Sequence, residues 1–206
     1  MIIWESLNEK IARVKQDGTI QAIAEGTTKI NAKCGNITKQ ITVNVVKKLP
    51  FTDVKASSWY YPAVKYVYEN NIITGTNSYT FSPTTKLTRG MLVTILYRME
   101  GAPTVTGAPK FSDVKDSSKY YYKAVKWASD KKIVSGYQDG RFGPGDNVTR
   151  EQLAVILNSY AKYKGKNVSA TNNLSVFEDK DKIASWALPQ VKWACRRWNN
   201  FRKHIQ

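Results

Sequence analysis

The sequence predicts a mainly α repeat module, built from helix–loop–helix units and preceded by a partial β-sandwich segment. Three observations predict this fold class. A block of about 60 residues recurs along the chain after residue 50. Within each copy, apolar residues return at the spacing of an amphipathic helix. The first fifty residues instead carry short β-prone runs between turn residues, which is typical of strands joined by hairpins.

The internal repeat is present twice in full and once in part. Its opening segment Phe51–Val54 recurs as Phe111–Val114 and, in weaker form, as Phe177–Asp179. In each copy an aromatic-led run with helical periodicity follows: Trp59–Tyr66, Tyr120–Trp127 and Trp186–Trp193. In the two full copies a glycine turn, a Phe-x-Pro segment and a Thr-Arg pair then follow in the same order: Gly75 and Gly136, Phe81–Pro83 and Phe142–Pro144, and Thr88-Arg89 and Thr149-Arg150.

Each full unit reads as a helix, a loop and a second helix. Ser58 and Ser118 are predicted N-caps of the first helices, because a hydroxyl oxygen accepts from the free amides of a first turn. Thr149 with Gln152 predicts a capping box for the second helix of unit two. Apolar stripes define the buried faces, and one such hairpin is too small to bury its own stripe. We therefore expect the units to pack on one another.

These motifs resemble the S-layer-homology family, whose pattern is F-x-D-V, W-Y-x-x-A-V, I-x-G, G-x-F-x-P and T-R-A-E. The resemblance covers Phe51 to about Trp193, roughly two thirds of the chain. It implies three repeats in pseudo-threefold symmetry, with the second helices in a central bundle. It also implies grooves between repeats that bind secondary cell-wall polysaccharides of Gram-positive bacteria, often ones bearing ketal-linked pyruvate. The implied role is non-covalent anchoring of S-layer proteins and exoenzymes, outside the cell at the wall.

Candidate polysaccharide-binding residues follow from the chemistry of an acidic sugar. An arginine fork matches a carboxylate, and a helix N-terminus favours an anion. Aromatic faces can stack on sugar rings, and carboxylates can bond hydroxyls. The predicted set is Arg89, Arg150, Asp53, Asp113, Trp59, Tyr120, Trp186, Gly75 and Gly136. A structural interpretation stands beside each: the aspartates as turn caps, the aromatics as core, the arginines as solvated or paired, and the glycines as conformational.

Two departures from the family pattern concern repeats one and three. The T-R-A-E segment becomes Thr88–Met91 in the first repeat, without the Glu151 and Gln152 of the second, which predicts a weaker first pocket. The third repeat loses the pattern after Ala194, as in a truncation or a fused foreign reading frame. We therefore expect at most two formed grooves, and either reduced stability or self-association through the surface that an incomplete third repeat leaves uncovered.

The first 46 residues resemble the C-terminal half of a bacterial Ig-like (group 2) domain. The matching segments are Trp4–Asn8, Ile11–Ala22, Gly26–Ala32 and Thr42–Val45, and Asp17-Gly18 is a hairpin signal. The resemblance implies a spacer or adhesion module whose opening strands are missing. The predicted organisation is a partial Ig-like domain at 1–46, a linker at 47–50, repeat one at 51–101, repeat two at 111–165, and a truncated repeat three with an atypical tail at 177–206.

The amino-acid composition restricts both the class of partner and the kinds of site that the chain can form. The net charge of +16 favours an anionic partner such as an anionic secondary cell-wall polymer or a peptidoglycan-associated glycan. Because the chain has two distant cysteines and a single histidine, we expect no disulfide framework, no metal site and no cofactor. No apolar run is long enough to span a membrane, and we expect the export signal to have been lost upstream.

Two alternatives remain open. The basic charge also suits a nucleic-acid-binding protein, although no motif for specific nucleic acid is visible. The chain also fits the anchoring remnant of a secreted cell-wall enzyme. No paired-carboxylate pocket or nucleophile motif indicates catalysis in the chain itself.

Overall fold

A computed structural model describes residues 1–46, 48–169, 173–175 and 177–198, the last three by their helical backbone. The predicted linker at 47–50 and the atypical tail lie partly outside these residues. The chain divides into two compact units, each described by itself below. Unit 1 comprises Met1–Lys65 and Gly75–Phe81, and unit 2 comprises Tyr66–Thr74 and Ser82–Gln206. The domain boundaries proposed from the sequence stay a prediction.

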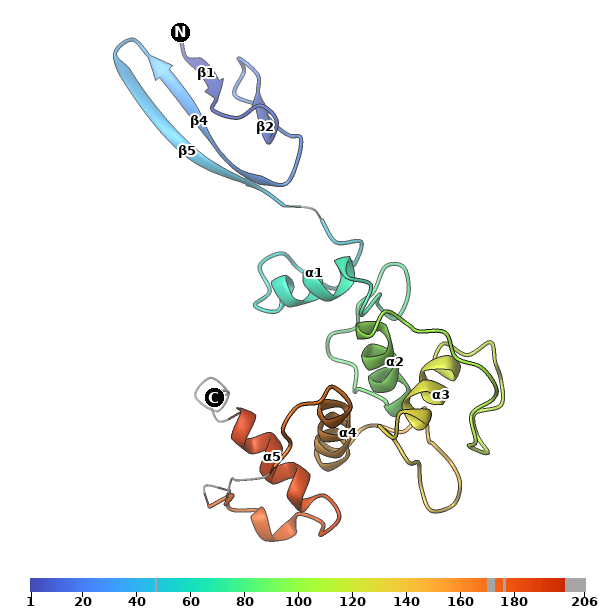
Figure 1. Cartoon of the computed structure of the whole chain (residues 1–206). Helices are drawn as coiled ribbons and strands as arrows, with labels where there is room; N and C mark the ends of the chain where they lie inside the picture. The colour runs from blue at the N-terminus through green and yellow to red at the C-terminus, as the bar shows by residue number, and fades with distance from the viewer. Residues whose placement is uncertain (47, 170–172, 176, 199–206) are drawn as a thin grey trace. The chain divides into compact units, whose positions relative to one another are not determined.

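The N-terminal segment of unit 1 is a small antiparallel β structure. Strands β1 (Ile3–Ser6), β4 (Gly26–Cys34) and β5 (Ile37–Val45) form one sheet in the order β1-β4-β5, and β2 (Ala12–Val14) pairs with β3 (Ile20–Ala22) as a hairpin (Figure 1). The Asp17-Gly18 turn is confirmed: the Asp17 carboxylate accepts from the Thr19 amide at 2.8 Å, and Gly18 adopts φ +87°. Strand β1 was not among the predicted strands.

The helices of the repeat region follow the predicted order. The first helices of the three repeats are α1 (Tyr61–Glu69), α3 (Tyr122–Asp130) and α5 (Leu188–Trp198). The second helices of repeats one and two are α2 (Arg89–Met99) and α4 (Arg150–Tyr163), and a short 3-10 turn, η1 (Lys180–Lys182), precedes α5. The structure thus confirms a β segment followed by helical hairpins.

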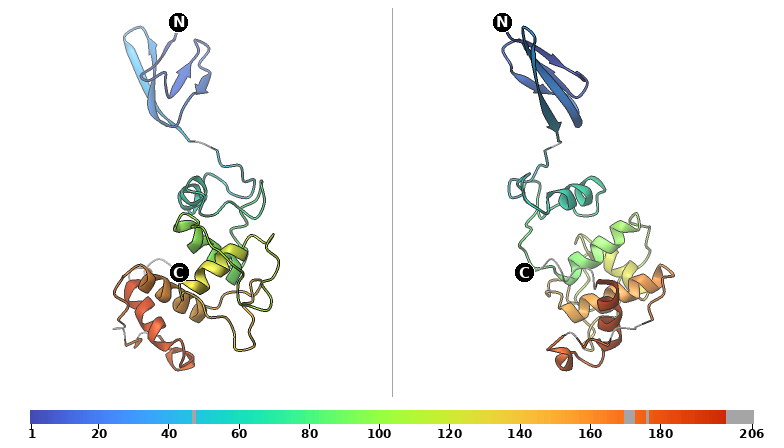
Figure 2. Two further views of the ribbon diagram at one scale, coloured as in Figure 1. Left: turned by 45° about the vertical axis from the view of Figure 1, so that its right-hand side comes forward. Right: turned by 90° about the vertical axis from the view of Figure 1, so that its left-hand side faces the viewer.

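Packing between repeats builds the core of unit 2. Helix α2 of repeat one packs on α3 of repeat two, and α4 of repeat two packs on α5 of repeat three (Figure 2). The main core joins α2 to the whole of repeat two through fully buried side chains such as Val93, Val125, Trp127 and Phe142. A smaller core of Ala154, Trp193 and Ala194 joins α4 to α5. The second helix of each repeat is therefore buried by the first helix of the next.

The predicted caps are confirmed for the second helices and wrong for a first helix. Thr88 accepts from the Met91 amide, and Thr149 with Gln152 forms the predicted capping box. Helix α3, however, starts after Tyr121, with no side-chain cap. Ser118 instead bonds Asp116 at 2.6 Å, because an aspartate two residues earlier offers a closer partner than the helix.

Candidate functional site

Each full repeat closes on itself through its aspartate. In repeat one, Asp53 accepts from the Phe81 amide at 2.9 Å. In repeat two, both oxygens of Asp113 accept, from the Phe142 and Gly143 amides at 2.8 and 2.7 Å. The capped amides lie 28 to 30 residues further along the chain, so these carboxylates hold the loop between the two helices against the start of the repeat.

The glycines of the I-x-G turns are required by close packing. A Cβ at Gly75 would lie 2.6 Å from a Phe51 ring carbon, and one at Gly136 would lie 2.5 Å from a Phe111 ring carbon. Both residues have positive φ, at +89° and +79°, which a side chain rarely adopts. The structure gives both glycines a conformational role, and their predicted part in ligand binding stays a prediction.

The first seam joins the start of α2 to the loop of repeat two. We define it by Thr88–Gly90 and the loop Tyr137–Val148. Its backbone is paired by three hydrogen bonds of 2.9 Å: the Arg89 amide to the Asp146 carbonyl, the Gly90 amide to the Pro144 carbonyl, and the Val148 amide to the Leu87 carbonyl. Since loop carbonyls occupy the first two amides of α2, the expectation that these amides are free for an anion is wrong.

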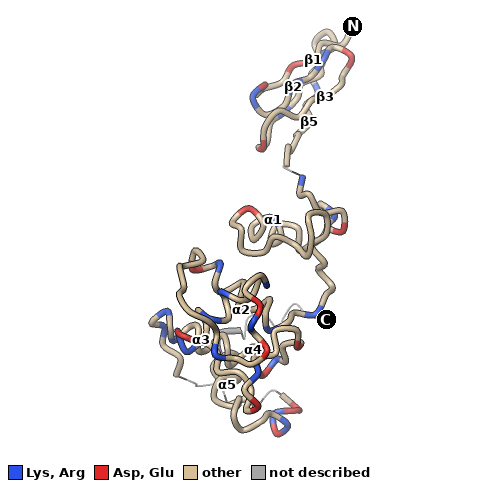
Figure 3. Tube along the Cα trace, turned by 90° about the vertical axis from the view of Figure 1, so that its right-hand side faces the viewer, with Lys and Arg blue, Asp and Glu red and all other residues tan. Residues whose placement is uncertain are grey.

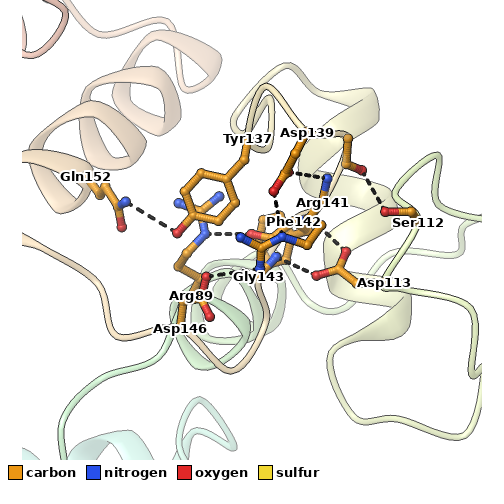
Figure 4. Close-up of polar contacts among 11 residues, drawn as sticks. Arg89, Ser112, Asp113, Tyr137, Asp139, Arg141, Phe142, Gly143, Asp146 and Gln152 are labelled. Atoms are coloured by element: carbon orange, nitrogen blue, oxygen red, sulfur yellow. Dashed lines mark hydrogen bonds and ion pairs between the residues drawn. The ribbon is translucent and has the colours of Figure 1, made fainter.

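Arg89 is enclosed within this seam. Its side chain donates from Nε to the Phe142 carbonyl at 2.7 Å, and its guanidinium lies 4.6 Å from the Tyr137 ring centroid and 4.7 Å from that of Phe142 (Figure 4). Only 5% of the residue is exposed. Burial lowers the pKa of Arg89, an effect that the nearby Tyr137, Asp146 and Asp113 oppose. The guanidinium remains charged, since an arginine keeps its proton in a protein.

The outer rim of the first seam carries a second arginine. Arg141 Nε donates to Asp139 at 2.7 Å, and its guanidinium lies 3.6 Å from Asp146. These carboxylates, Asp139 first, raise the pKa of Arg141. Gln152 of α4 reaches the Tyr137 hydroxyl at 3.5 Å, so helix α4 also borders this seam. Sequence reasoning did not select Tyr137, Arg141 or Asp146, which have no counterpart at the equivalent positions of repeat one, Thr76, Thr80 and Thr85.

The second seam joins the start of α4 to repeat three. The Glu151 side chain accepts from the Ala184 amide at 2.7 Å, in the turn that leads through Trp186 into α5. Arg150, the counterpart of Arg89, is exposed. Among the residues that the structure describes, none accepts from the Arg150 or Glu151 amides, and none pairs with the Arg150 guanidinium. This helix start therefore offers both a cation and open amides.

The three aromatic candidates lie on the surface. Trp59, Tyr120 and Trp186, which occupy equivalent positions of the three repeats, are 90%, 56% and 56% exposed. The helical spacing also allowed a core position, and that interpretation is wrong for all three. Trp186 follows Ala184 of the second seam by two residues. Tyr120 packs edge-on against Tyr121 at 5.1 Å, and it is the Tyr121 ring that lies beside Gly90 of the first seam. Asp53 and Trp59 belong to unit 1.

Charge and ligand geometry limit the chemistry of the described residues. In unit 2, basic and acidic residues are interspersed along the helices and loops (Figure 3). Within the described part of the chain, no group of three or more His, Cys, Asp or Glu side chains is arranged to hold a metal ion. Within the same residues, no helix has the length and apolar character that crossing a bilayer requires.

The geometry defines a class of protein with tandem helical hairpins, preceded by a β segment. In it, the first helix of one repeat packs on the second helix of the repeat before it. The chain matches the S-layer homology domain over residues 50–90 and 110–154, and the bacterial Ig-like domain over residues 2–47. The chain therefore carries two S-layer homology repeats behind an N-terminal bacterial Ig-like domain. S-layer homology domains are cell-surface anchoring modules that bind cell-wall polymers.

Curated relatives combine this module with other regions. The chain is 34% identical to an endoglucanase of Bacillus sp. (strain KSM-635) over 145 residues, 70% of this chain and 15% of the relative. It is 28% identical to the surface-layer 125 kDa protein of Lysinibacillus sphaericus over 182 residues, 82% of this chain and 15% of the relative. A cellulosome-anchoring protein of Acetivibrio thermocellus is 28% identical over 113 residues, 53% of this chain and 25% of that protein. The chain thus spans a minor part of each relative.

Proposed function

We propose that this chain anchors to the cell wall by binding an anionic secondary cell-wall polysaccharide, often pyruvylated in this family, at the seams between its repeats. The observation that carries the proposal is the second seam. There an exposed arginine, two open helix amides and the turn bearing an exposed tryptophan belong to one helix–turn contact. A carboxylate is matched by a guanidinium and by amides at a helix N-terminus.

We propose that the two seams contribute unequally to polysaccharide binding. Arg89 has little exposed surface and its helix amides are occupied, so Arg150 takes the larger share of binding. Trp186 at the second seam and Tyr120 near the first supply flat faces for sugar rings. Asp53, Asp113, Gly75 and Gly136 keep their proposed places in the set through the loops and turns that they shape, and Trp59 keeps its place as an exposed flat face.

A sedimentation assay with cell-wall sacculi tests the proposal. Wild-type protein should sediment with intact sacculi and remain in solution once the secondary polymer has been extracted. Arg150→Ala should weaken retention about tenfold or more, the loss expected for one charge-assisted contact. The matched control is Arg13→Ala, which removes the same charge from an exposed site paired only at 4.0 Å with Glu9, and should bind like wild type.

Two outcomes would overturn the seam as the binding site. One is equal retention of the wild type and both arginine variants. The other is undiminished binding to extracted sacculi. Duplex DNA at the same ionic strength should bind no more tightly than the polymer, which separates anchoring from the nucleic-acid alternative.

We further propose that the chain itself is not an enzyme and acts outside the cell at the wall. The S-layer homology repeats anchor, and the relatives named as enzymes are matched over a minor part of their length. Zymography on peptidoglycan with this chain should give no clear zone, and a clear zone would contradict this. Self-association through the third repeat stays a prediction.

A further inference from the structure

The backbone of Ala184, in repeat three, is bonded in two directions. Its carbonyl accepts from the Ala187 and Leu188 amides at 2.9 and 3.1 Å, which closes the turn that leads into α5. Its amide donates to the Glu151 side chain of α4 at 2.7 Å. Trp186 lies within this turn. Its backbone is therefore fixed to the start of α5 and, through Glu151, to the first turn of α4.

The equivalent amide of repeat two has a partner within its own repeat. Ala184 corresponds to Ser118 by the spacing that aligns the first helices of repeats two and three. The Ser118 amide donates to the Asp116 side chain, two residues earlier, at 2.9 Å. Aspartate commonly closes a turn in this way, by accepting from the backbone two residues on. The turn before α3 therefore carries its own acceptor.

Repeat three has no such acceptor at the corresponding position. The residue there is Lys182, whose ammonium group can only donate. Glu151 supplies the acceptor instead, from the preceding repeat. The counterpart of Glu151 in repeat one is Gly90, which has no side chain and meets repeat two through its backbone amide, 2.9 Å from the Pro144 carbonyl. The two positions thus change together: glycine goes with Asp116 in the turn, and glutamate goes with lysine.

We propose that Glu151 is a positioning residue for polysaccharide binding. It holds the turn of repeat three against the first turn of α4 and so sets where the Trp186 ring stands relative to Arg150. Arg150 is the neighbour of Glu151 in α4, and Trp186 follows the bonded amide by two residues. A link that fixes two binding groups before the ligand arrives lowers the ordering cost of the complex. The inference rests on the proposed function, because it assigns how two of the proposed binding groups are brought to one glycan.

Hydrogen exchange of the Ala184 amide, followed by NMR on the whole chain, tests the link itself. Glu151→Ala should raise the exchange rate of this amide about tenfold, because the amide loses its acceptor. Glu151→Gln should leave the rate within about twofold, since a glutamine carbonyl oxygen accepts from the same amide. The Ser118 amide keeps its bond to Asp116 and should exchange alike in all three proteins. Equal exchange of the Ala184 amide in wild type and Glu151→Ala would overturn the link.

Sedimentation with cell-wall sacculi tests the positioning role. Glu151→Ala should weaken retention about fivefold or more, although Arg150 and Trp186 are both present. Glu151→Gln should be retained at least as well as wild type, because it keeps the bond and removes a negative charge next to the proposed anion site. Retention of Glu151→Ala at the wild-type level, or an equal loss in both variants, would overturn the proposal.

A second substitution separates positioning from support of the turn alone. Lys182→Asn places a local acceptor at the position that Asp116 has in repeat two. In the Glu151→Ala background it should return the Ala184 amide to slow exchange without restoring retention, because the turn is then closed but not held to α4. Lys182→Asn alone is the control for the lost lysine charge and should bind within about twofold of wild type. Full recovery of retention in the double variant would show that Glu151 acts on the turn alone, which overturns the proposal.

The positioning role and the proposed function fail by different results. A wild type that sacculi do not retain, or that they retain equally after extraction of the secondary polymer, would overturn the proposed function. A wild type whose retention depends on the polymer and on Arg150, but not on Glu151, would leave the proposed function standing and overturn the positioning role.

Discussion

The two seams of unit 2 start from the same dipeptide and end in opposite environments. Thr88-Arg89 and Thr149-Arg150 both begin a second helix, with the threonine as N-cap in each. Arg89 is buried between Tyr137 and Phe142, whereas Arg150 is exposed. The difference comes from the following repeat: repeat two supplies a loop that covers its seam, and the described part of repeat three supplies only a turn.

This comparison separates two roles for one motif. At the first seam the arginine donates a hydrogen bond to a carbonyl and fills the space between two rings. Its main effect is therefore on the stability of the contact between repeats one and two. At the second seam the arginine adds little to stability and is available to a ligand. Mutations at paired positions should therefore give unequal effects, and the largest difference is expected for the arginines themselves.

Arg89→Ala should destabilise unit 2 by about 2–4 kcal/mol, because it leaves the buried Phe142 carbonyl without its charged donor and opens a cavity between two rings. Arg150→Ala should change the free energy of unfolding by less than about 0.5 kcal/mol, as exposed substitutions do. Urea denaturation followed by tryptophan fluorescence measures both, since Trp127 is buried in this core. Equal losses for the two variants would remove the distinction between a structural and a binding arginine.

Gly90→Ala should destabilise the first seam by about 1–3 kcal/mol, although alanine is the residue of the family pattern there. An added Cβ would lie 2.8 Å from the Pro144 carbonyl oxygen, and that backbone is held by its own bond to Gly90. Gly145→Ala, in the same loop, meets nothing within 4 Å and is the matched control, which should stay within about 0.5 kcal/mol. If Gly90→Ala left the free energy of unfolding unchanged, the first seam would have room for the added methyl group.

Much of the fold could be predicted from the sequence because its signals are local. The repeat order, the second-helix caps and the Asp17-Gly18 hairpin depend on residues a few positions apart. Strand β1 was not predicted as a strand, although β2 and β3 are shorter. Strand β5 begins at Ile37, before the matched segment Thr42–Val45, because Thr38, Lys39 and Gln40 conceal the alternation. The seams could not be predicted, since a Thr-Arg pair does not indicate which loop will cover it.

The exposure of the aromatic candidates was also beyond sequence reasoning. Trp59, Tyr120 and Trp186 each precede their helix by two residues, where the helical periodicity that separates core from surface does not yet apply. For the aspartates, the role was predicted but the bonded amides were not. A capping role was foreseen for Asp53 and Asp113, but within a local turn, and the actual amides belong to a loop that only the folded repeat brings near.

The smallest expected effect concerns the C-terminal ends of the second helices, where repeats one and two also differ. Glu100, the C-cap residue of α2, accepts from the Tyr160 hydroxyl of α4 at 2.5 Å and from Lys164, the C-cap residue of α4, at 3.0 Å. By the repeat spacing its counterpart is Ala161, so repeat two cannot form this link to repeat three. The hydrogen bond from Tyr160, followed by that from Lys164, lowers the pKa of Glu100.

A carboxyl whose pKa is lower in the folded state stabilises the fold above its unfolded pKa of about 4.3 and loses that contribution as the pH falls through the folded value. Glu100→Gln should therefore cost about 1 kcal/mol at pH 7, and the difference from wild type should shrink below about pH 4. Urea denaturation between pH 3 and 7 measures it, with the exposed Glu9→Gln as control. A difference that is constant with pH would show that the carboxylate charge has no part in this contact, and that Glu100 joins the helices by packing alone.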